Sequence, residues 1–166
     1  MNVITVNKRD LTVKAKQLRR SGMVPGSVFG GPLTDSISLQ IDEATVRKLF
    51  REKREGSKLK IDLDGKLILV QIKEKAVNTL SNEILHISFQ ALKADRKVNS
   101  VIHILLKNTE KVTESLEKAL MEIPYAALPE DMIDTITIDV DGMAAGSVIT
   151  VVDIPELESE KIDLQV

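Results

Sequence analysis

The sequence has no cysteine and no tryptophan, and it contains one tyrosine and three phenylalanines among 166 residues. Without cysteine there can be no disulfides, thiolate metal ligands or cysteine nucleophiles. With so few aromatics, the core must be built from Ile, Leu, Val and Ala, and the branched aliphatics among these suit the half-buried surfaces of β-sheets. No window approaches the roughly 18 apolar residues that a membrane span requires, and the N-terminus MNVITVNKRD has no long apolar stretch. We expect a soluble, cytoplasmic, β-rich protein with no membrane partner.

Recognisable catalytic and cofactor motifs are also missing. The sequence contains no GxSxG, HExxH or P-loop pattern, and its glycines do not match GxGxxG. The segment DVDG at 139–142 resembles the start of a calcium loop, but Ala144, Ala145 and Gly146 stand where oxygen ligands would be needed. The only histidines, His86 and His103, fall on predicted strands, where a structural role is the commoner outcome. We predict that the protein is not an enzyme and binds no metal, cofactor or small-molecule substrate.

The net charge of −2 hides a strong asymmetry between the two halves of the chain. Residues 1–94 hold 17 Lys/Arg and 10 Asp/Glu, a balance of +7, whereas residues 95–166 hold 6 Lys/Arg and 15 Asp/Glu, a balance of −9. Such a division suggests two domains with different electrostatic tasks, the basic one facing a polyanion. The alternative is that the charge asymmetry arises by chance from solvated surface residues. The polar run KADRKVN after Leu92 marks the boundary. We predict a basic domain at 1–93 and an acidic one at 94–166.

The pattern of the first half predicts a small β-barrel or curled sheet with two helices. In the first helix Thr12 is the expected N-cap and Gly22 the end; in the second, Asp42 caps and Gly56 stops it. Asp64-Gly65 fits the two-residue type I′ turn of a hairpin. The predicted strands are 2–6, 27–30, 36–41, 58–63, 66–73 and 83–92.

The second half also reads as mainly β. Alternating or β-branched runs predict strands at 100–106, 134–142 and 147–154. The segment 113–131 is ambiguous, because Leu116, Ala119 and Leu120 have helical spacing but Pro124 must end any helix before it. We expect a short helix or turn followed by a strand at about residues 121–127. The predicted fold class is therefore mainly β with a few short helices: an N-terminal barrel and a β-rich C-terminal domain.

The basic N-terminal segment is the candidate binding site. It contains six cations within thirteen residues, opposed only by Asp10. Helical spacing places Lys16, Arg19 and Arg20 on one face, as phosphate binding requires. Phe29 could stack on a base, although a protein with so few aromatics usually buries them. The alternative is a solvated helix beside an ordinary turn. The six cations are Lys8, Arg9, Lys14, Lys16, Arg19 and Arg20.

The order of these motifs resembles a known family. The segments LRRSGMVPGSVFGG and HISF are similar to the signature of the bacterial large-subunit ribosomal proteins that bind 5S ribosomal RNA, the twenty-fifth of that series. The segment LPEDMIDTITIDVDGMAAGSVITVVDI at 128–154 is similar to the second domain of its longer members, the general stress protein CTC type. The resemblance covers nearly the whole chain. It implies a barrel that docks on 5S RNA, with ribosomal neighbours as partners.

The resemblance also implies particular contacts. Lys16, Arg19 and Arg20 correspond to phosphate contacts, His86 to a contact from the barrel face, and Lys73 with Glu74 to a further polar pair. The sequence departs from the family pattern at 11–13, Phe29, 76–77 and Ser88. We predict a non-catalytic, ribosome-associated 5S RNA-binding protein. The alternative is a stress-related paralogue that acts as a protein-interaction module, with weak or lost RNA binding.

Overall fold

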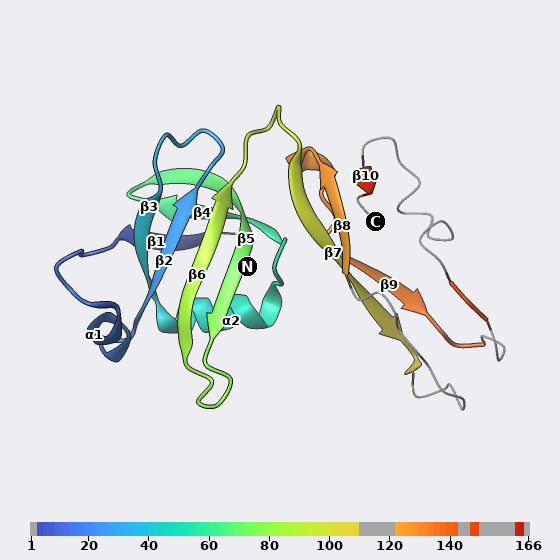
Figure 1. The fold of residues 1–166 in the computed structure, drawn as a ribbon, viewed down its shortest axis with the longest axis horizontal. Coiled ribbons are helices and arrows are strands. Elements are labelled where there is room, and N and C mark those ends of the chain that lie inside the picture. Colours follow the sequence, from blue (N-terminus) through green and yellow to red (C-terminus); the bar gives the residue numbers. More distant parts are fainter. Residues whose placement is uncertain (1–2, 110–121, 143–146, 150–161, 165–166) are drawn as a thin grey trace. The chain divides into compact units, whose positions relative to one another are not determined.

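The computed structural model describes residues 3–109, 122–142, 147–149 and 162–164 (Figure 1). The chain divides into two compact units, Met1–Ala94 (unit 1) and Asp95–Val166 (unit 2). Unit 1 is a closed barrel and unit 2 contains a four-stranded sheet. The predicted fold class, mainly β with an N-terminal barrel, two helices and a second β-rich part, is confirmed.

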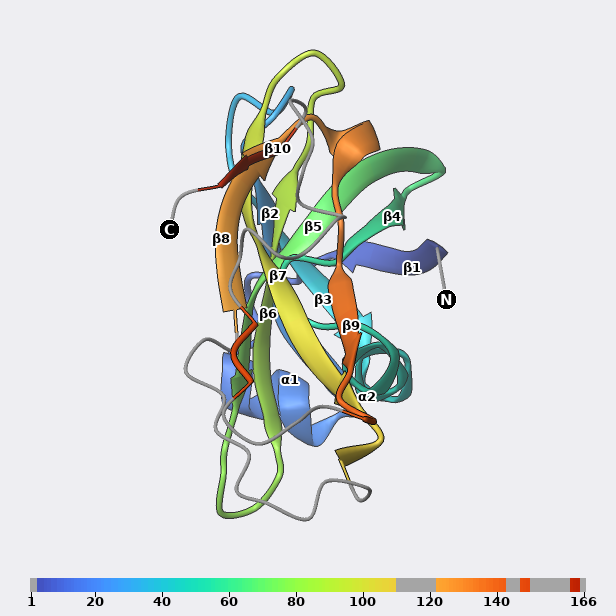
Figure 2. The ribbon, with the colours of Figure 1, turned by 90° about the vertical axis from the view of Figure 1, so that its right-hand side faces the viewer.

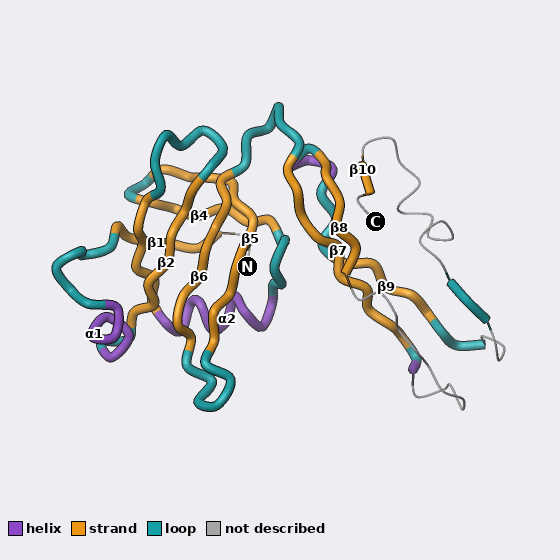
Figure 3. The backbone as a smooth tube through the Cα atoms, in the orientation of Figure 1, coloured by secondary structure: helices purple, strands orange, loops and turns teal. Residues whose placement is uncertain are grey.

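Unit 1 closes six strands into a ring in the order β1-β3-β2-β6-β5-β4. The ring contains two parallel pairs, β1 with β4 and β2 with β6, and the other neighbours are antiparallel. Figure 3 shows α1 outside the strands and α2 across one end of the barrel. The elements are β1 (Val3–Lys8), α1 (Ala15–Arg20), β2 (Met23–Phe29), β3 (Ile37–Asp42), α2 (Glu43–Glu52), β4 (Lys58–Leu63), β5 (Lys66–Val77) and β6 (Ile84–Ala91).

The β4–β5 hairpin follows directly from its sequence. Leu59, Ile61 and Leu63 alternate into the core, and the strands pair from Lys58 with Gln71 to Leu63 with Lys66. Asp64 and Gly65 join them, with φ values of 52° and 84°. Positive φ at both central residues is what a type I′ turn needs, so the predicted turn is confirmed.

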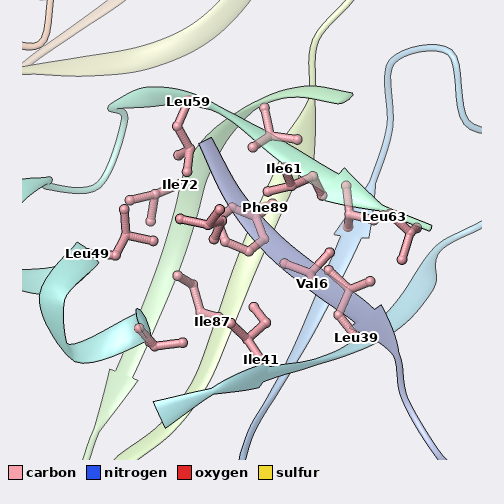
Figure 4. Close-up of a cluster of buried hydrophobic side chains, with 14 of the residues drawn as sticks. Val6, Leu39, Ile41, Leu49, Leu59, Ile61, Leu63, Ile72, Ile87 and Phe89 are labelled. Atoms are coloured by element: carbon pink, nitrogen blue, oxygen red, sulfur yellow. The ribbon is translucent and has the colours of Figure 1, made fainter. Parts of the chain in front are cut away.

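The barrel core consists of aliphatic side chains around one phenylalanine (Figure 4). Val46 and Leu49 of α2 are fully buried in this core, and Phe50 packs against it from a half-buried position. The helix is amphipathic, and the core covers its apolar face. Asp42 is the N-cap residue, as predicted, although its side chain makes no capping hydrogen bond. The helix ends at Glu52, before the predicted stop at Gly56.

The predicted capping of α1 by Thr12 is wrong. The helix begins at Ala15, with Lys14 as its N-cap residue, two residues after Thr12, and no side-chain capping bond. Thr12 is engaged instead by Asp10, whose Oδ1 accepts hydrogen bonds from the Thr12 hydroxyl at 2.6 Å and backbone N–H at 3.0 Å. These bonds hold the pKa of Asp10 below its usual value. Asp10 therefore shapes the turn that leads from β1 into α1.

Strand β2 begins earlier and β5 ends later than their patterns predict. β2 starts at Met23 because Met23 to Val28 all pair with β3, even though Pro25 lacks an N–H. β5 continues to Val77 through a register shift between Ile72 and Glu74. A shift of this kind breaks strict alternation, and alternation is the signal on which strand prediction depends.

Unit 2 has the strand order β10-β8-β7-β9, and Figure 2 shows β8, β7 and β9 side by side. Its buried cluster is aliphatic except for one tyrosine. The predicted helix within 113–121 lies outside the described residues, as does most of the predicted strand at 147–154; residues 147–149 have no regular structure. The elements are β7 (Val98–Lys107), β8 (Glu122–Ala127), a 3₁₀ helix (Pro129–Asp131), β9 (Thr135–Asp139) and β10 (Ile162–Leu164).

Tyr125 links β8 to the segment that precedes β9. Its hydroxyl donates to the Ile133 carbonyl at 3.2 Å and accepts from the Ile133 N–H at 3.1 Å. The side chain is fully buried, and burial raises the pKa of its hydroxyl. The one tyrosine of the chain thus satisfies both polar groups of one backbone residue.

Replacing Tyr125 by phenylalanine is expected to destabilise unit 2 by about 1–3 kcal/mol, because both Ile133 groups lose their partner while the packing is kept. Urea unfolding followed by amide hydrogen exchange on β7 and β8 measures this effect. A loss below about 0.5 kcal/mol would mean that Ile133 finds other partners without cost.

Candidate nucleic-acid interface

Helix α1 carries the densest positive charge of unit 1. Its apolar anchor is Leu18, which is 4% exposed, and its last turn contains Arg19 and Arg20. Cations in the last turn of a helix interact favourably with its carbonyl end. Gly22 follows with φ 89°, a conformation that suits glycine as the chain turns into β2. The side chains of Lys14, Lys16 and Arg20 are exposed.

Arg19 differs from its neighbours because it is tied to the barrel. Its side chain is 22% exposed, and one guanidinium nitrogen donates to the Leu85 carbonyl of β6 at 3.3 Å. Its Nε lies 3.6 Å from a carboxylate oxygen of Glu83, on the loop before β6. The bonds of Arg19 therefore fix α1 beside β6, and Lys16 and Arg20 are held next to that strand.

Arg9 continues the β1 ladder beyond its last strand residue. Its backbone N–H donates to the Ser38 carbonyl at 2.9 Å, and its guanidinium donates to the Val13 carbonyl at 3.4 Å. Its Nε is buried without a hydrogen-bond partner. Lys8 pairs with Leu39 of β3. Because successive side chains of a strand point to opposite faces, Lys8 and Arg9 lie on opposite faces of the strand.

The outer face of β2 and β6 lies beside α1. Ile87 and Phe89 are fully buried, so alternation turns His86, Ser88 and Gln90 outward. The parallel register of β2 and β6 pairs Ser27 with Ser88 and Phe29 with Gln90. This face presents hydroxyl, amide and imidazole groups in adjacent positions.

His86 is the centre of a group of charged side chains. It is half-buried, and its Nδ1 lies 3.4 Å from the Ser88 hydroxyl. Burial lowers the pKa of His86, and the nearby Arg9 and Arg19 lower it further, while Glu74 acts in the opposite direction. The structure therefore brings together Arg9, Arg19 and His86, which lie far apart in the sequence.

The other predicted residues have separate positions. Phe29 is half-buried on the outer face, four residues along the β2–β6 register from His86, or about 13 Å at 3.3 Å per residue. It is absent from the buried core cluster, contrary to the usual burial of aromatics. Lys73 is exposed at the register shift of β5, beside Glu74. Lys8 is exposed at the end of β1.

We call the set formed by Arg9, Lys14, Lys16, Arg19, Arg20 and His86 the cationic surface. Sequence reasoning did not identify Glu83 and the Leu85 carbonyl as the groups that position Arg19. No local pattern marks a loop carboxylate as the partner of an arginine more than sixty residues away. The alternation in ILHISFQA does place Ser88 on the same face as His86.

Metal-binding clusters and membrane-spanning helices are both absent from the part of the chain that the structure describes. These residues contain no group of three or more His, Cys, Asp or Glu side chains arranged to hold a metal ion. Among the described helices, none is long and apolar enough to cross a membrane.

The fold and the cationic surface define a two-unit β protein: a small barrel with a basic helix beside an outward strand face, followed by a separate four-stranded sheet. The model of the ribosomal L25p family matches residues 4–89, and that of the C-terminal domain of ribosomal protein TL5 matches residues 97–164. The chain belongs to the ribosomal L25p family, as the resemblance of its motifs predicts.

Individual relatives agree with this assignment. The chain is 26% identical to "Large ribosomal subunit protein bL25" of Bacillus pumilus, over 98% of this chain and 80% of the relative. It is 29% identical to the protein of the same name from Nitrosomonas europaea, over 97% of this chain and 84% of the relative. A third, from Akkermansia muciniphila, is 29% identical over 84% of this chain and 71% of the relative.

Proposed function

We propose that the protein is a non-catalytic component of the bacterial large ribosomal subunit and that unit 1 binds 5S ribosomal RNA through the cationic surface. The observation that carries the proposal is the meeting of Arg9, Arg19 and His86 beside the exposed cations of α1. Membership of the L25p family and the names of the relatives support the ribosomal setting. Its partners would be 5S RNA and neighbouring large-subunit proteins, in the cytoplasm.

The chemistry of the surface suits a folded RNA. Double-stranded RNA presents phosphates and 2′-hydroxyls across a wide, shallow minor groove and is recognised mainly by shape. Lys16 and Arg20 are placed to neutralise phosphates, because Arg19 fixes their helix against β6. The outward Ser88 and Gln90 can exchange hydrogen bonds with sugar hydroxyls. Phe29, farther along the face, offers an apolar ring to an unstacked base.

The first test is a salt-dependent binding titration of the full chain. Lys16→Ala/Arg20→Ala is expected to weaken binding to 5S RNA at least about tenfold near physiological salt, since bonds to charged groups contribute roughly 1.5–3 kcal/mol each. The plot of log affinity against log salt concentration should become less steep, by about one unit of slope for each phosphate that the variant no longer neutralises. Filter binding at several salt concentrations measures both quantities.

The matched control is Lys60→Ala/Lys66→Ala, which removes the same charge from exposed positions on β4 and at the start of β5. Lys60 pairs with Val3, six residues before Arg9, and Lys66 lies ten residues before Ala76, the β5 residue that pairs with His86, so both positions are away from the cationic surface. The control should bind 5S RNA like the wild type. Equal losses in both double variants, or wild-type binding no tighter to 5S RNA than to an unrelated hairpin, would overturn the proposal. The second result would favour a protein-interaction module.

A further inference from the structure

His86 has charged neighbours on several elements of unit 1. Arg19 of α1 donates to the carbonyl of Leu85, the residue before His86, and Glu74 of β5 pairs with Ser88, two residues after it. Glu74, Arg9 and Arg19 all act electrostatically on the imidazole. The other adjacent strand, β2, has the sequence MVPGSVF and contributes no charged side chain. On its own strand, the nearest polar partner is the Ser88 hydroxyl, 3.4 Å from Nδ1. His86 is thus a half-buried imidazole near two guanidinium groups and one carboxylate.

We infer that the binding of RNA at the cationic surface is coupled to the uptake of one proton by His86. The inference rests on the proposed function and adds a form of regulation to it: the affinity for RNA depends on pH through one residue. Ser88 contacts Nδ1, so Nε2 is the ring nitrogen left to donate to an anion.

The direction of the coupling follows from the charges. In the free protein, burial first and then the two arginines lower the pKa of His86, so the imidazole is neutral near neutral pH. Phosphates that neutralise Arg9 and Arg19 remove this repulsion and add negative charge beside the ring, which favours the imidazolium. The bound state therefore holds its proton to a higher pH than the free state. The affinity for RNA must therefore rise as the pH falls from the pKa of His86 in the complex to its pKa in the free protein.

The size of the effect is limited by the single proton. Affinity can change by at most about tenfold per pH unit within this interval and becomes independent of pH on either side of it. We expect a total gain of roughly three- to tenfold between pH 7.5 and pH 5.5 at constant ionic strength, the range in which histidine changes charge.

The experiment measures proton uptake directly. The full chain is titrated with 5S RNA by calorimetry near pH 6.5 in buffers of different ionisation enthalpy, with ionic strength held constant. The wild type is expected to take up a measurable fraction of one proton, and His86→Gln none. The matched control is His103→Gln, because the chain has two histidines and His103 lies in unit 2 on β7. It should take up protons like the wild type.

A second readout is the titration of the two imidazoles by NMR, free and RNA-bound, with circular dichroism to verify that the variants fold. His86 should titrate at higher pH in the complex than in the free protein. If the wild type binds 5S RNA tightly but takes up no proton, or if His86→Gln retains the uptake, the inference is wrong and the proposed function stands. Absence of specific 5S RNA binding at every pH overturns the proposed function, and the inference with it.

Discussion

Replacing Phe89 by alanine is expected to lower the free energy of unfolding of unit 1 by about 3–5 kcal/mol. Phe89 is fully buried and pairs with Val28 on one side and Ile72 on the other, in the middle of the barrel core (Figure 4). The other ring at this core, Phe50, packs against it from a half-buried position on α2, and the closed barrel limits collapse around the cavity. Denaturant unfolding followed by far-UV circular dichroism measures the loss.

Two companion variants separate cavity formation from a general loss of aromatic surface. Phe89→Leu leaves a smaller cavity and should cost about 1.5 kcal/mol. Phe29→Ala removes a half-buried ring from the outer face and should cost about 1 kcal/mol or less. It should, however, weaken RNA binding if the ring stacks on a base. A loss of stability in Phe29→Ala equal to that in Phe89→Ala would contradict the placement of Phe29 outside the core.

Gly31→Ala is the second change with a large expected effect, about 2–5 kcal/mol in the stability of unit 1. Gly31 lies in the loop between β2 and β3 with φ 55°. A Cβ there would lie 2.6 Å from the Ala91 carbonyl oxygen and 2.8 Å from its carbon, both backbone atoms at the end of β6. The left-handed conformation costs an alanine about 1–2 kcal/mol, and the overlap with backbone adds roughly 1–3 kcal/mol. Thermal unfolding by calorimetry gives the change.

The neighbouring Gly30 provides the control. Its φ is 79°, but a Cβ there would meet the flexible Gln90 side chain at 3.6 Å and the Ala91 carbonyl oxygen at 3.9 Å, both ordinary distances. Gly30→Ala should therefore cost only the conformational strain, about 1–2 kcal/mol. If the two variants unfold at the same temperature, the close approach of the β2–β3 loop to β6 does not restrict the side chain at residue 31.

The locally encoded parts of unit 1 could be predicted from the sequence, and its closure could not. Helix α2 and the β4–β5 hairpin have clear periodicity and an Asp-Gly turn, so their signals lie within about twenty residues. The barrel is closed by parallel pairs instead. Val3 pairs with Lys60 and Gly26 with Ile87, contacts that no local pattern encodes. Hydrophobic alternation shows that a strand has a buried face, but it does not identify the partner strand.

The candidate site shows the same division. Helical spacing identified the cations of α1, whereas only the family resemblance indicated His86 as a contact from the barrel face. The tie from Arg19 to Glu83 and Leu85, and the approach of Arg9 to His86, depend on how β1, α1 and β6 meet. Thr12 failed as a cap for a local reason that composition does not reveal: the Asp10 carboxylate takes both of its donors.

The burial of Tyr125 has a practical consequence. The chain has no tryptophan, and its single tyrosine lies in unit 2. Intrinsic fluorescence therefore comes from one known position, enclosed in the second sheet and bonded to Ile133. A change in tyrosine emission directly reports the state of unit 2, whereas the barrel is silent at that wavelength. The wild-type chain thus carries its own optical probe, and the unfolding of its second unit can be followed without a label.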